Sequence, residues 1–469
     1  MKRAAAIAAL SAVLATAVPA AGHGSITPFR IGPGSPAYWS RVAGPVFAGN
    51  SIVWGRATRA GYEIVVQRGR HSRRRTIAFD GVSHYRDYET RLSASPTRIG
   101  LSLGVTGCRS EAWCENDIWA PVFDAAVTAP LAGPFSTLAK GCATWSEGAE
   151  SGRPPEPVDV SGDVVAYGDC ERTVHVRDLA PDGEGAGRDY PPGDDVRVAG
   201  DFVAVQRGDE VTVSNWRTGA DLFTVDAPYG FDVAADGTVV YGMPEVEHVA
   251  WSSPVAPAPH VIPGATTYVT AFAGGRIADS KDLDPGVRFT VRNLDGSEVA
   301  SAITRGSIGS PDYDGRRLAW FEQPCQAGWL VVWDGHGKRP KPPGGQCPFP
   351  RLVPRSVHLG KKGRLRARLA CPRDRRLGCV AYVGARKPGT GGLGLAHHFR
   401  SEPGETSGAR IGDRQNVCRD RYGRLRTQVV IRVYQRGDMG RPWTPARWWD
   451  RASTVRVRGG GVSAPRCAA

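Results

Sequence analysis

Side chains that could form a hydrolytic or metal centre occur in this 469-residue chain, but not at the spacings that such centres need. The ten histidines are scattered and no His-Glu-x-x-His is present. His397 and His398 fall in a glycine-rich stretch typical of a solvated loop, and His175 alternates with Val174 and Val176 as a structural strand residue does. Neither Gly-x-Ser-x-Gly nor Cys-x-x-Cys occurs. We therefore predict no metal and no cofactor, and the sequence leaves enzymatic activity undecided.

Arginines are the residues whose spacing does indicate a chemistry. In "GRLRARLAC" every second residue is arginine and the residues between are apolar, so a β-strand would place the arginines on one face. "VVIRVYQR" and "TVRVRG" repeat this pattern. Such a face attracts anionic polymers, although arginine also occupies solvent-facing strand positions that bind nothing. The predicted polyanion-binding residues are Arg364, Arg366, Arg368, Arg432, Arg436, Arg456 and Arg458.

Net charge divides the chain near residue 350. Residues 351–469 contain 27 Lys or Arg and 7 Asp or Glu, a net charge of +20. Residues 1–350 contain the remaining 33 basic and 39 acidic residues, a net charge of −6. The Pro- and Gly-dense stretch "GHGKRPKPPGGQCPFPRLVP" lies between the two parts and is typical of a linker. The overall charge of +14 therefore comes from the C-terminal part alone.

The N-terminus and the cysteines both indicate export. Lys2 and Arg3 precede an uncharged apolar run, and Val18-Pro19-Ala20 supplies small residues for cleavage, so we predict a signal peptide. In an exported chain, ten cysteines indicate five disulfides. Two pairs enclose short turn-like segments and are predicted as local, Cys371–Cys379 and Cys108–Cys114. The other three are assigned as Cys142–Cys170, Cys325–Cys347 and Cys418–Cys467, pairings that spacing alone does not determine.

A turn followed by a short aliphatic strand recurs along residues 46–345. Examples are "VFAGNSIVWG", "DVSGDVVAYG" and "DYDGRRLAW". Successive copies are 47, 66, 38, 36, 38 and 41 residues apart, and this near-constant period with strand patterning is typical of propeller blades. Two or three β-sandwiches are the alternative, but sandwiches do not repeat at a fixed period. The anchoring aliphatic residues of the seven copies are Ile52, Ile99, Val165, Val203, Val239, Ile277 and Leu318.

One copy carries a recognisable motif. Ser310-Pro311-Asp312, followed by "DGRRLA" from Asp314, resembles the "SPDG-K/R-x-I-A" core of TolB-type, WD40-like propeller repeats, with Tyr313 inserted. Residues 233–241 are a looser match, and the resemblance extends over about residues 46–340. It implies a scaffold whose relatives mostly bind proteins or glycans, with enzymes in the minority.

These patterns together predict an all-β chain. We expect a signal peptide (1–20), a Pro/Gly-rich N-terminal segment (21–45), a β-propeller (46–345), a linker (346–355) and a small, basic, disulfide-stapled β-sandwich (356–469). Seven blades are predicted, with six as the alternative. The predicted function is a secreted, monomeric, non-catalytic scaffold without a membrane span, which binds extracellular protein or glycan and attaches through its arginine-rich tail to anionic polymers of the envelope or matrix. The alternative is a glycan-active lyase or hydrolase with its site in the propeller channel.

Overall fold

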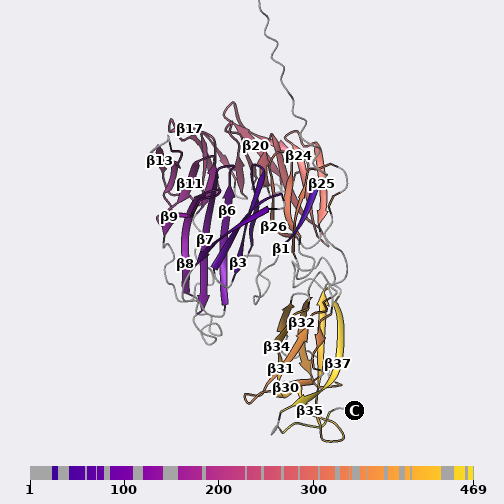
Figure 1. Ribbon diagram of the computed structural model, residues 1–469. Coiled ribbons are helices and arrows are strands. Elements are labelled where there is room, and N and C mark those ends of the chain that lie inside the picture. Colours follow the sequence, from indigo (N-terminus) through magenta and orange to yellow (C-terminus); the bar gives the residue numbers. More distant parts are fainter. Residues whose placement is uncertain are drawn as a thin grey trace, which may run out of the picture.

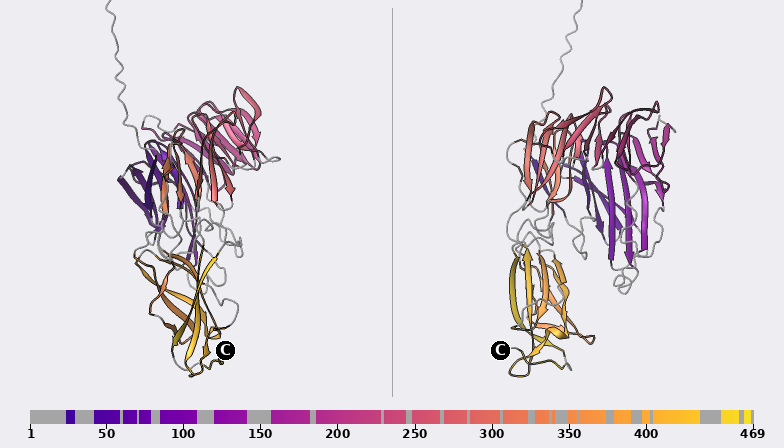
Figure 2. Two further views of the ribbon diagram at one scale, coloured as in Figure 1. Left: turned by 90° about the vertical axis from the view of Figure 1, so that its right-hand side faces the viewer. Right: turned by 180° about the vertical axis from the view of Figure 1, so that it is seen from behind.

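Seven four-stranded antiparallel sheets form a ring in the computed structural model of the protein (Figures 1 and 2). The structure describes residues 24–29, 42–58, 61–69, 71–78, 85–108, 120–140, 157–181, 186–227, 230–243, 248–265, 269–283, 286–304, 307–322, 328–336, 339–340, 349–354, 356–373, 379–389, 397–401, 404–434, 448–459 and 463–467. This arrangement is a seven-bladed β-propeller, so the prediction of seven blades is confirmed.

The first four blades follow one another along the chain. Blade 1 is β2 (Val42–Ala48), β3 (Ser51–Thr58), β4 (Gly61–Arg68) and β5 (His71–Ala78). Blade 2 is β6 (Tyr85–Ala94), β7 (Arg98–Cys108), β8 (Ala120–Pro130) and β9 (Ser136–Lys140). Blade 3 is β10 (Val158–Ser161), β11 (Val164–Gly168), β12 (Val174–Asp178) and β13 (Gly187–Tyr190). Blade 4 is β14 (Asp195–Ala199), β15 (Phe202–Arg207), β16 (Glu210–Asn215) and β17 (Ala220–Asp226).

The last blade takes its fourth strand from the N-terminus, which closes the ring. Blade 5 is β18 (Phe231–Val233), β19 (Val239–Gly242), β20 (Val249–Ser253) and β21 (Ala256–Ile262). Blade 6 is β22 (Val269–Ala273), β23 (Arg276–Leu283), β24 (Gly286–Asn293) and β25 (Glu298–Thr304). Blade 7 is β26 (Ser307–Tyr313), β27 (Leu318–Glu322), β28 (Gly328–Trp333) and the N-terminal β1 (Gly24–Phe29), which pairs antiparallel with β28.

The recurring turns and aliphatic strands follow from simple local requirements. In six of the seven blades the turn between the first two strands contains a glycine with a positive φ, which glycine adopts without strain, as at Gly200 (φ 56°) and Gly315 (φ 88°). The second strand of each blade is packed between its neighbours, so its aliphatic residues are buried. All seven anchoring residues have 7% exposure or less. In blade 7 every residue of β27 is buried and Trp320 is fully so.

A separate nine-stranded sheet follows the propeller, and we call it the C-terminal sheet. Its strands are β29 (Arg351–Leu352), β30 (Ser356–Leu359), β31 (Arg364–Ala370), β32 (Cys379–Arg386), β33 (His397–Ser401), β34 (Thr406–Asp413), β35 (Cys418–Arg419), β36 (Leu425–Tyr434) and β37 (Trp448–Arg458). His397 and His398 open β33, so their prediction as a loop pair was wrong. The reason is that Val383 and Tyr382 of β32 pair with them, a non-local contact that the glycine-rich context conceals.

Two of the predicted disulfides are present in the C-terminal sheet region. Cys371–Cys379 joins the end of β31 to the start of β32, and Cys418–Cys467 ties β35 to the C-terminal segment. Cys170 is also disulfide-bonded, and no cysteine of the described segments is free. Each of the three other predicted pairs includes a residue outside the described residues.

Helical structure is almost absent from these segments. The only helix in the described residues is the 3₁₀ turn η2 (Arg414–Asn416), and none of the described chain forms a helix long and apolar enough to cross a membrane. The prediction of an all-β chain is confirmed.

Candidate functional site

The first strands of the seven blades lie next to one another around the centre of the ring. The second strand of each blade carries the anchoring aliphatic residue. The residue directly after this anchor pairs with one residue of the first strand. We call these the inter-blade positions, because several of them bond to the next blade. They are occupied by Val46, Ser93, Asp159, Arg197, Asp232, Ala271 and Asp312.

Four inter-blade positions accept a hydrogen bond from a backbone N–H of the following blade. Ser93 Oγ accepts from Val160 at 3.2 Å, and Asp159 Oδ2 accepts from Val198 at 2.7 Å. Asp232 Oδ2 accepts from Phe272 at 2.8 Å. Asp312 Oδ2 accepts from Phe47 at 2.6 Å, which joins blade 7 to blade 1 across the closure of the ring. These side chains satisfy backbone donors that would otherwise lie unpaired between blades.

Burial sets the electrostatics of these carboxylates. Desolvation raises the pKa of Asp232 to about 7, against the opposing attraction of Arg197. Desolvation also raises the pKa of Asp312 to about 6 and shifts the pKa of Asp159 upward. Burial disfavours the Arg197 cation, but the surrounding Asp195, Asp159 and Asp232 outweigh it and raise the pKa of Arg197.

Arg197 is held within an ionic cluster that spans two blades. Its Nη1 lies 3.0 Å from Asp195 Oδ1, and Arg91 Nη1 of blade 2 reaches the same oxygen at 2.6 Å. One carboxylate oxygen of Asp195 therefore bridges an arginine of blade 2 and an arginine of blade 4. No group of three or more His, Cys, Asp or Glu side chains in the described segments is arranged to hold a metal ion.

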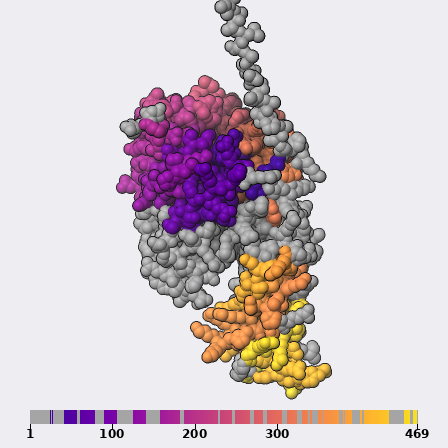
Figure 3. Space-filling model, in the orientation of Figure 1, coloured from indigo at the N-terminus to yellow at the C-terminus, as the bar shows by residue number. Residues whose placement is uncertain are grey.

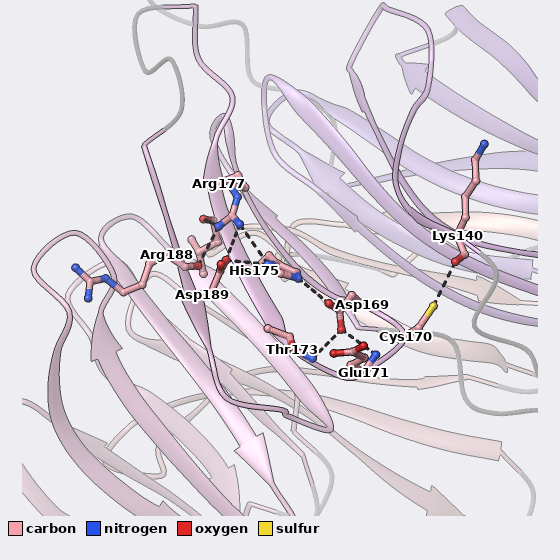
Figure 4. Close-up of polar contacts among 10 residues, drawn as sticks. Lys140, Asp169, Cys170, Glu171, Thr173, His175, Arg177, Arg188 and Asp189 are labelled. Carbon is pink, nitrogen blue, oxygen red and sulfur yellow. Dashed lines mark hydrogen bonds and ion pairs between the residues drawn. The ribbon is translucent and has the colours of Figure 1, made fainter.

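A second ionic cluster surrounds His175 in blade 3 (Figure 4). His175 Nδ1 lies 2.8 Å from Asp189 Oδ1, and its Nε2 lies 3.0 Å from Asp169 Oδ2. Arg177 also donates to Asp189, and the hydrogen bonds from His175 and then Arg177 lower the pKa of Asp189. His175 is thus a strand residue, as predicted, and its ring joins β12 and β13 to the turn at Asp169.

The arginines of the C-terminal sheet lie on its outward face, because they alternate with buried residues. On β31, Arg366 and Arg368 are exposed whereas Leu365, Ala367 and Leu369 are buried. On β37, Arg456 and Arg458 are likewise exposed. Figure 3 shows the described residues of this sheet at one end of the molecule, in orange and yellow.

Strand pairing brings three arginines and one histidine into one line across the sheet. Arg410 of β34 is directly opposite Arg366 of β31, which is opposite His358 of β30, which is opposite Arg458 of β37. Directly opposed residues share a face and lie close together. All four are exposed, and none of them forms an ion pair with another described residue. We call this line the cation row.

Only some of the arginines predicted to bind polyanions lie in or next to the cation row. Arg366 and Arg458 belong to the cation row, Arg368 is two residues from Arg366 on the same strand, and Arg456 lies opposite Arg426. Arg364 is half-buried opposite Asp413. Arg432 lies opposite Asp450, away from the row, and Arg436 falls outside the described residues.

Sequence reasoning missed two members of the row, His358 and Arg410. Both alternate with buried residues: His358 lies between Val357 and Leu359, and Arg410 between Ala409 and Ile411. The alternation of "SVHL" and "GARIG" was therefore a usable signal, but each strand carries only one cation.

The fold and these sites define a seven-bladed propeller followed by a disulfide-bonded, arginine-faced β-sheet region. No family model and no curated protein matches the sequence. Among solved structures, BamB from Moraxella catarrhalis matches with 13% identity and a TM-score of 0.36, over 73% of this chain and 94% of that chain. U3-55K matches with 11% identity and a TM-score of 0.41, over 65% and 98%.

The WD40 domain of Toxoplasma gondii coronin is also similar, with 11% identity and a TM-score of 0.35, over 67% of this chain and 87% of that chain. The propeller fold that the resemblance to WD40-like repeats implied is confirmed by the seven four-stranded sheets of the structure itself. Identities and scores this low carry no argument about activity.

Proposed function

We propose that the protein is an exported, non-catalytic propeller that binds extracellular protein or glycan, and that its C-terminal sheet attaches it to anionic polymers of the envelope or matrix. The exposed arginines of the cation row, which form no ion pair with another described residue, are the single observation that carries this proposal. Disulfide bonds support an oxidising compartment outside the cytosol.

The inter-blade carboxylates support a structural use for the ring centre. One carboxylate oxygen accepts a hydrogen bond from a backbone N–H of the next blade in each of Asp159, Asp232 and Asp312. Arg197 is already paired with Asp195. A scaffold needs such fixed contacts, whereas a general base must reach a substrate proton.

Polyanion binding is tested with the full-length mature protein. We expect it to bind heparin, single-stranded DNA and polyphosphate at low salt, with an affinity that falls steeply as salt rises, because counterions are released on binding. The double variant Arg366→Glu/Arg368→Glu should weaken binding at every salt concentration. The matched control is Arg73→Glu/Arg74→Glu on β5, which changes the same net charge at exposed propeller positions. Equal loss in both variants, or no binding at low salt, would contradict the proposal.

A glycan-active lyase or hydrolase remains the alternative, and one observation favours it. The pKa of Asp232 is raised to about 7 close to Arg197, and a base near neutrality beside a cation is what a uronate lyase requires. Turnover of uronate-containing glycans that disappears in Asp232→Asn would support this alternative. If neither neutral nor acidic glycans are turned over, the enzyme alternative is contradicted and the scaffold proposal is retained.

A further inference from the structure

Repulsion within the cation row destabilises the sheet. A purely structural role for these side chains provides no interaction that offsets this repulsion. Like charges directly opposite one another on neighbouring strands destabilise a sheet. Arg366 faces Arg410 on one side and His358, a cation only when protonated, on the other, and no described carboxylate lies between them. Solvated surface arginines do not require this register, since a neutral or acidic residue at either neighbour would relieve the repulsion. An anionic ligand would relieve it too.

We propose that the cation row binds a linear phosphate polymer that runs across the strands, and that His358 makes this binding stronger in acid. The proposal rests on the polyanion-binding function proposed above. It assigns to that function a contact line, a ligand chemistry and a dependence on pH.

The dimensions of the row favour a ligand with closely spaced charges. Neighbouring strands are about 4.8 Å apart, so the four side chains cover about 14 Å of the sheet. A linear phosphate polymer carries a charge on every unit, and the planar guanidinium group bonds phosphate oxygens in pairs. No described aromatic side chain belongs to the row, so it offers contacts to an anionic backbone and no stacking surface for bases.

Histidine is the one residue type in the row that ordinarily changes its charge between pH 5 and 8. The charged groups that face it are Arg366 and the flanking Arg364 and Arg368 from β31, and Arg458 and Arg456 from β37. Lys361 and Lys362 follow in the turn after β30. All of these groups are cations.

A bound polyanion would neutralise the neighbouring arginines and attract a protonated imidazole. Protonation and binding must then favour each other by the same factor. One added charge at about 5 Å from a single anionic group in water corresponds to about a fourfold gain in affinity. Internal phosphate groups keep their charge from pH 5 to 8, and only terminal groups ionise near pH 6. The pH dependence therefore belongs to the protein.

The experiment measures the dissociation constant of full-length protein for medium-chain inorganic polyphosphate at pH 5.5 and pH 8.0, at constant ionic strength. We expect at least about fourfold tighter binding at pH 5.5. His358→Gln should remove most of this ratio, and His358→Lys should bind tightly at both pH values. The control His71→Gln changes an exposed histidine on β5 and should keep the wild-type ratio. Thermal unfolding of each variant checks that the fold is intact.

The outcomes separate this proposal from the one on which it rests. The role of His358 is contradicted if His358→Gln keeps the wild-type ratio of dissociation constants between pH 8.0 and pH 5.5, or if the wild type binds equally at both pH values. Neither result contradicts polyanion binding itself. Binding that is unaffected by Arg410→Gln overturns the row as the contact line, and tighter binding to heparin than to polyphosphate at matched charge overturns the phosphate assignment. Failure to bind any polyanion at low salt defeats the underlying function.

Discussion

Replacing Asp232 by asparagine should make the propeller more stable at pH 8 and leave its stability at pH 4 unchanged. The amide oxygen of asparagine can still accept the hydrogen bond from the Phe272 backbone N–H, which is 2.8 Å from Asp232 Oδ2. The substitution removes the buried charge and keeps the acceptor. It therefore isolates the electrostatic cost of ionising this side chain between blades 5 and 6.

The sign follows from the direction of the pKa shift. The pKa of Asp232 is raised from 3.8 to about 7 in the folded protein, so the folded state holds a proton that the unfolded chain releases. Below about pH 4 both states are protonated and the cost is absent. As the pH rises towards 7 the wild type loses stability, and above pH 7 the loss is complete.

The magnitude has an upper limit of about 4 kcal/mol, because the shift is about three units and each unit corresponds to about 1.4 kcal/mol. The residue as a whole keeps intermediate exposure although its carboxylate is desolvated, so the real cost is smaller than this limit. We therefore expect a gain of about 1–2 kcal/mol for Asp232→Asn at pH 8. Arg197 keeps Asp195 and Asp159 as counter-charges in the variant.

The assay is urea or thermal unfolding of both proteins from pH 4.5 to 8.5, read as the difference between variant and wild type at each pH. Asp236→Asn is the matched control, because Asp236 lies in the turn of the same blade, is exposed and also accepts a backbone hydrogen bond, from Thr238. Its difference should not vary with pH. If the Asp232→Asn difference is constant across the range, or if the variant is less stable at pH 8, our account of the buried carboxylate is wrong.

Three further predictions concern ring closure and the disulfides. Asp312→Ala should cost about 1–3 kcal/mol of stability because the Phe47 N–H loses its acceptor, whereas Asp312→Asn should cost much less; equal losses in the two variants would contradict this. Deleting residues 24–29 exposes the edge of β28 and should cause aggregation or rapid proteolysis, whereas a stable monomer would show that β1 is dispensable. Thiol titration of the unfolded, unreduced protein should find no reactive thiol, and two or more would contradict the disulfide framework.

The blades could be predicted from sequence because each is a local structure. A turn, an anchoring aliphatic and a second strand lie within about ten residues, so their pattern repeats visibly along the chain. The closing strand is different. Residues 24–29 pair with β28, about 300 residues away, and nothing in "GSITPF" indicates that partner. Pairing between strands this far apart depends on closure of the ring. The sequence of the N-terminal segment therefore did not predict that it is the fourth strand of blade 7.

The same distinction applies to the arginine face. Alternation along one strand is a local signal, and it placed Arg366, Arg368, Arg456 and Arg458 outward, as they are. The cation row depends on the mutual register of four strands between residues 356 and 458, which include one parallel pair. Single cations on β30 and β34 become part of a site only through that register.

Charged residues in this protein are of two kinds: some bond to other parts of the fold, and others have no oppositely charged partner among the described residues. Asp312, from the motif that resembles a propeller repeat, accepts the backbone N–H of Phe47 and so contributes directly to closing the ring. Its presence is explained by the fold alone, and it needs no ligand. Arg366 contributes no ion pair within the described chain and lies between Arg410 and His358. Because like charges on neighbouring strands destabilise a sheet, a bound anion of the kind proposed above would offset the cost of the Arg366 charge.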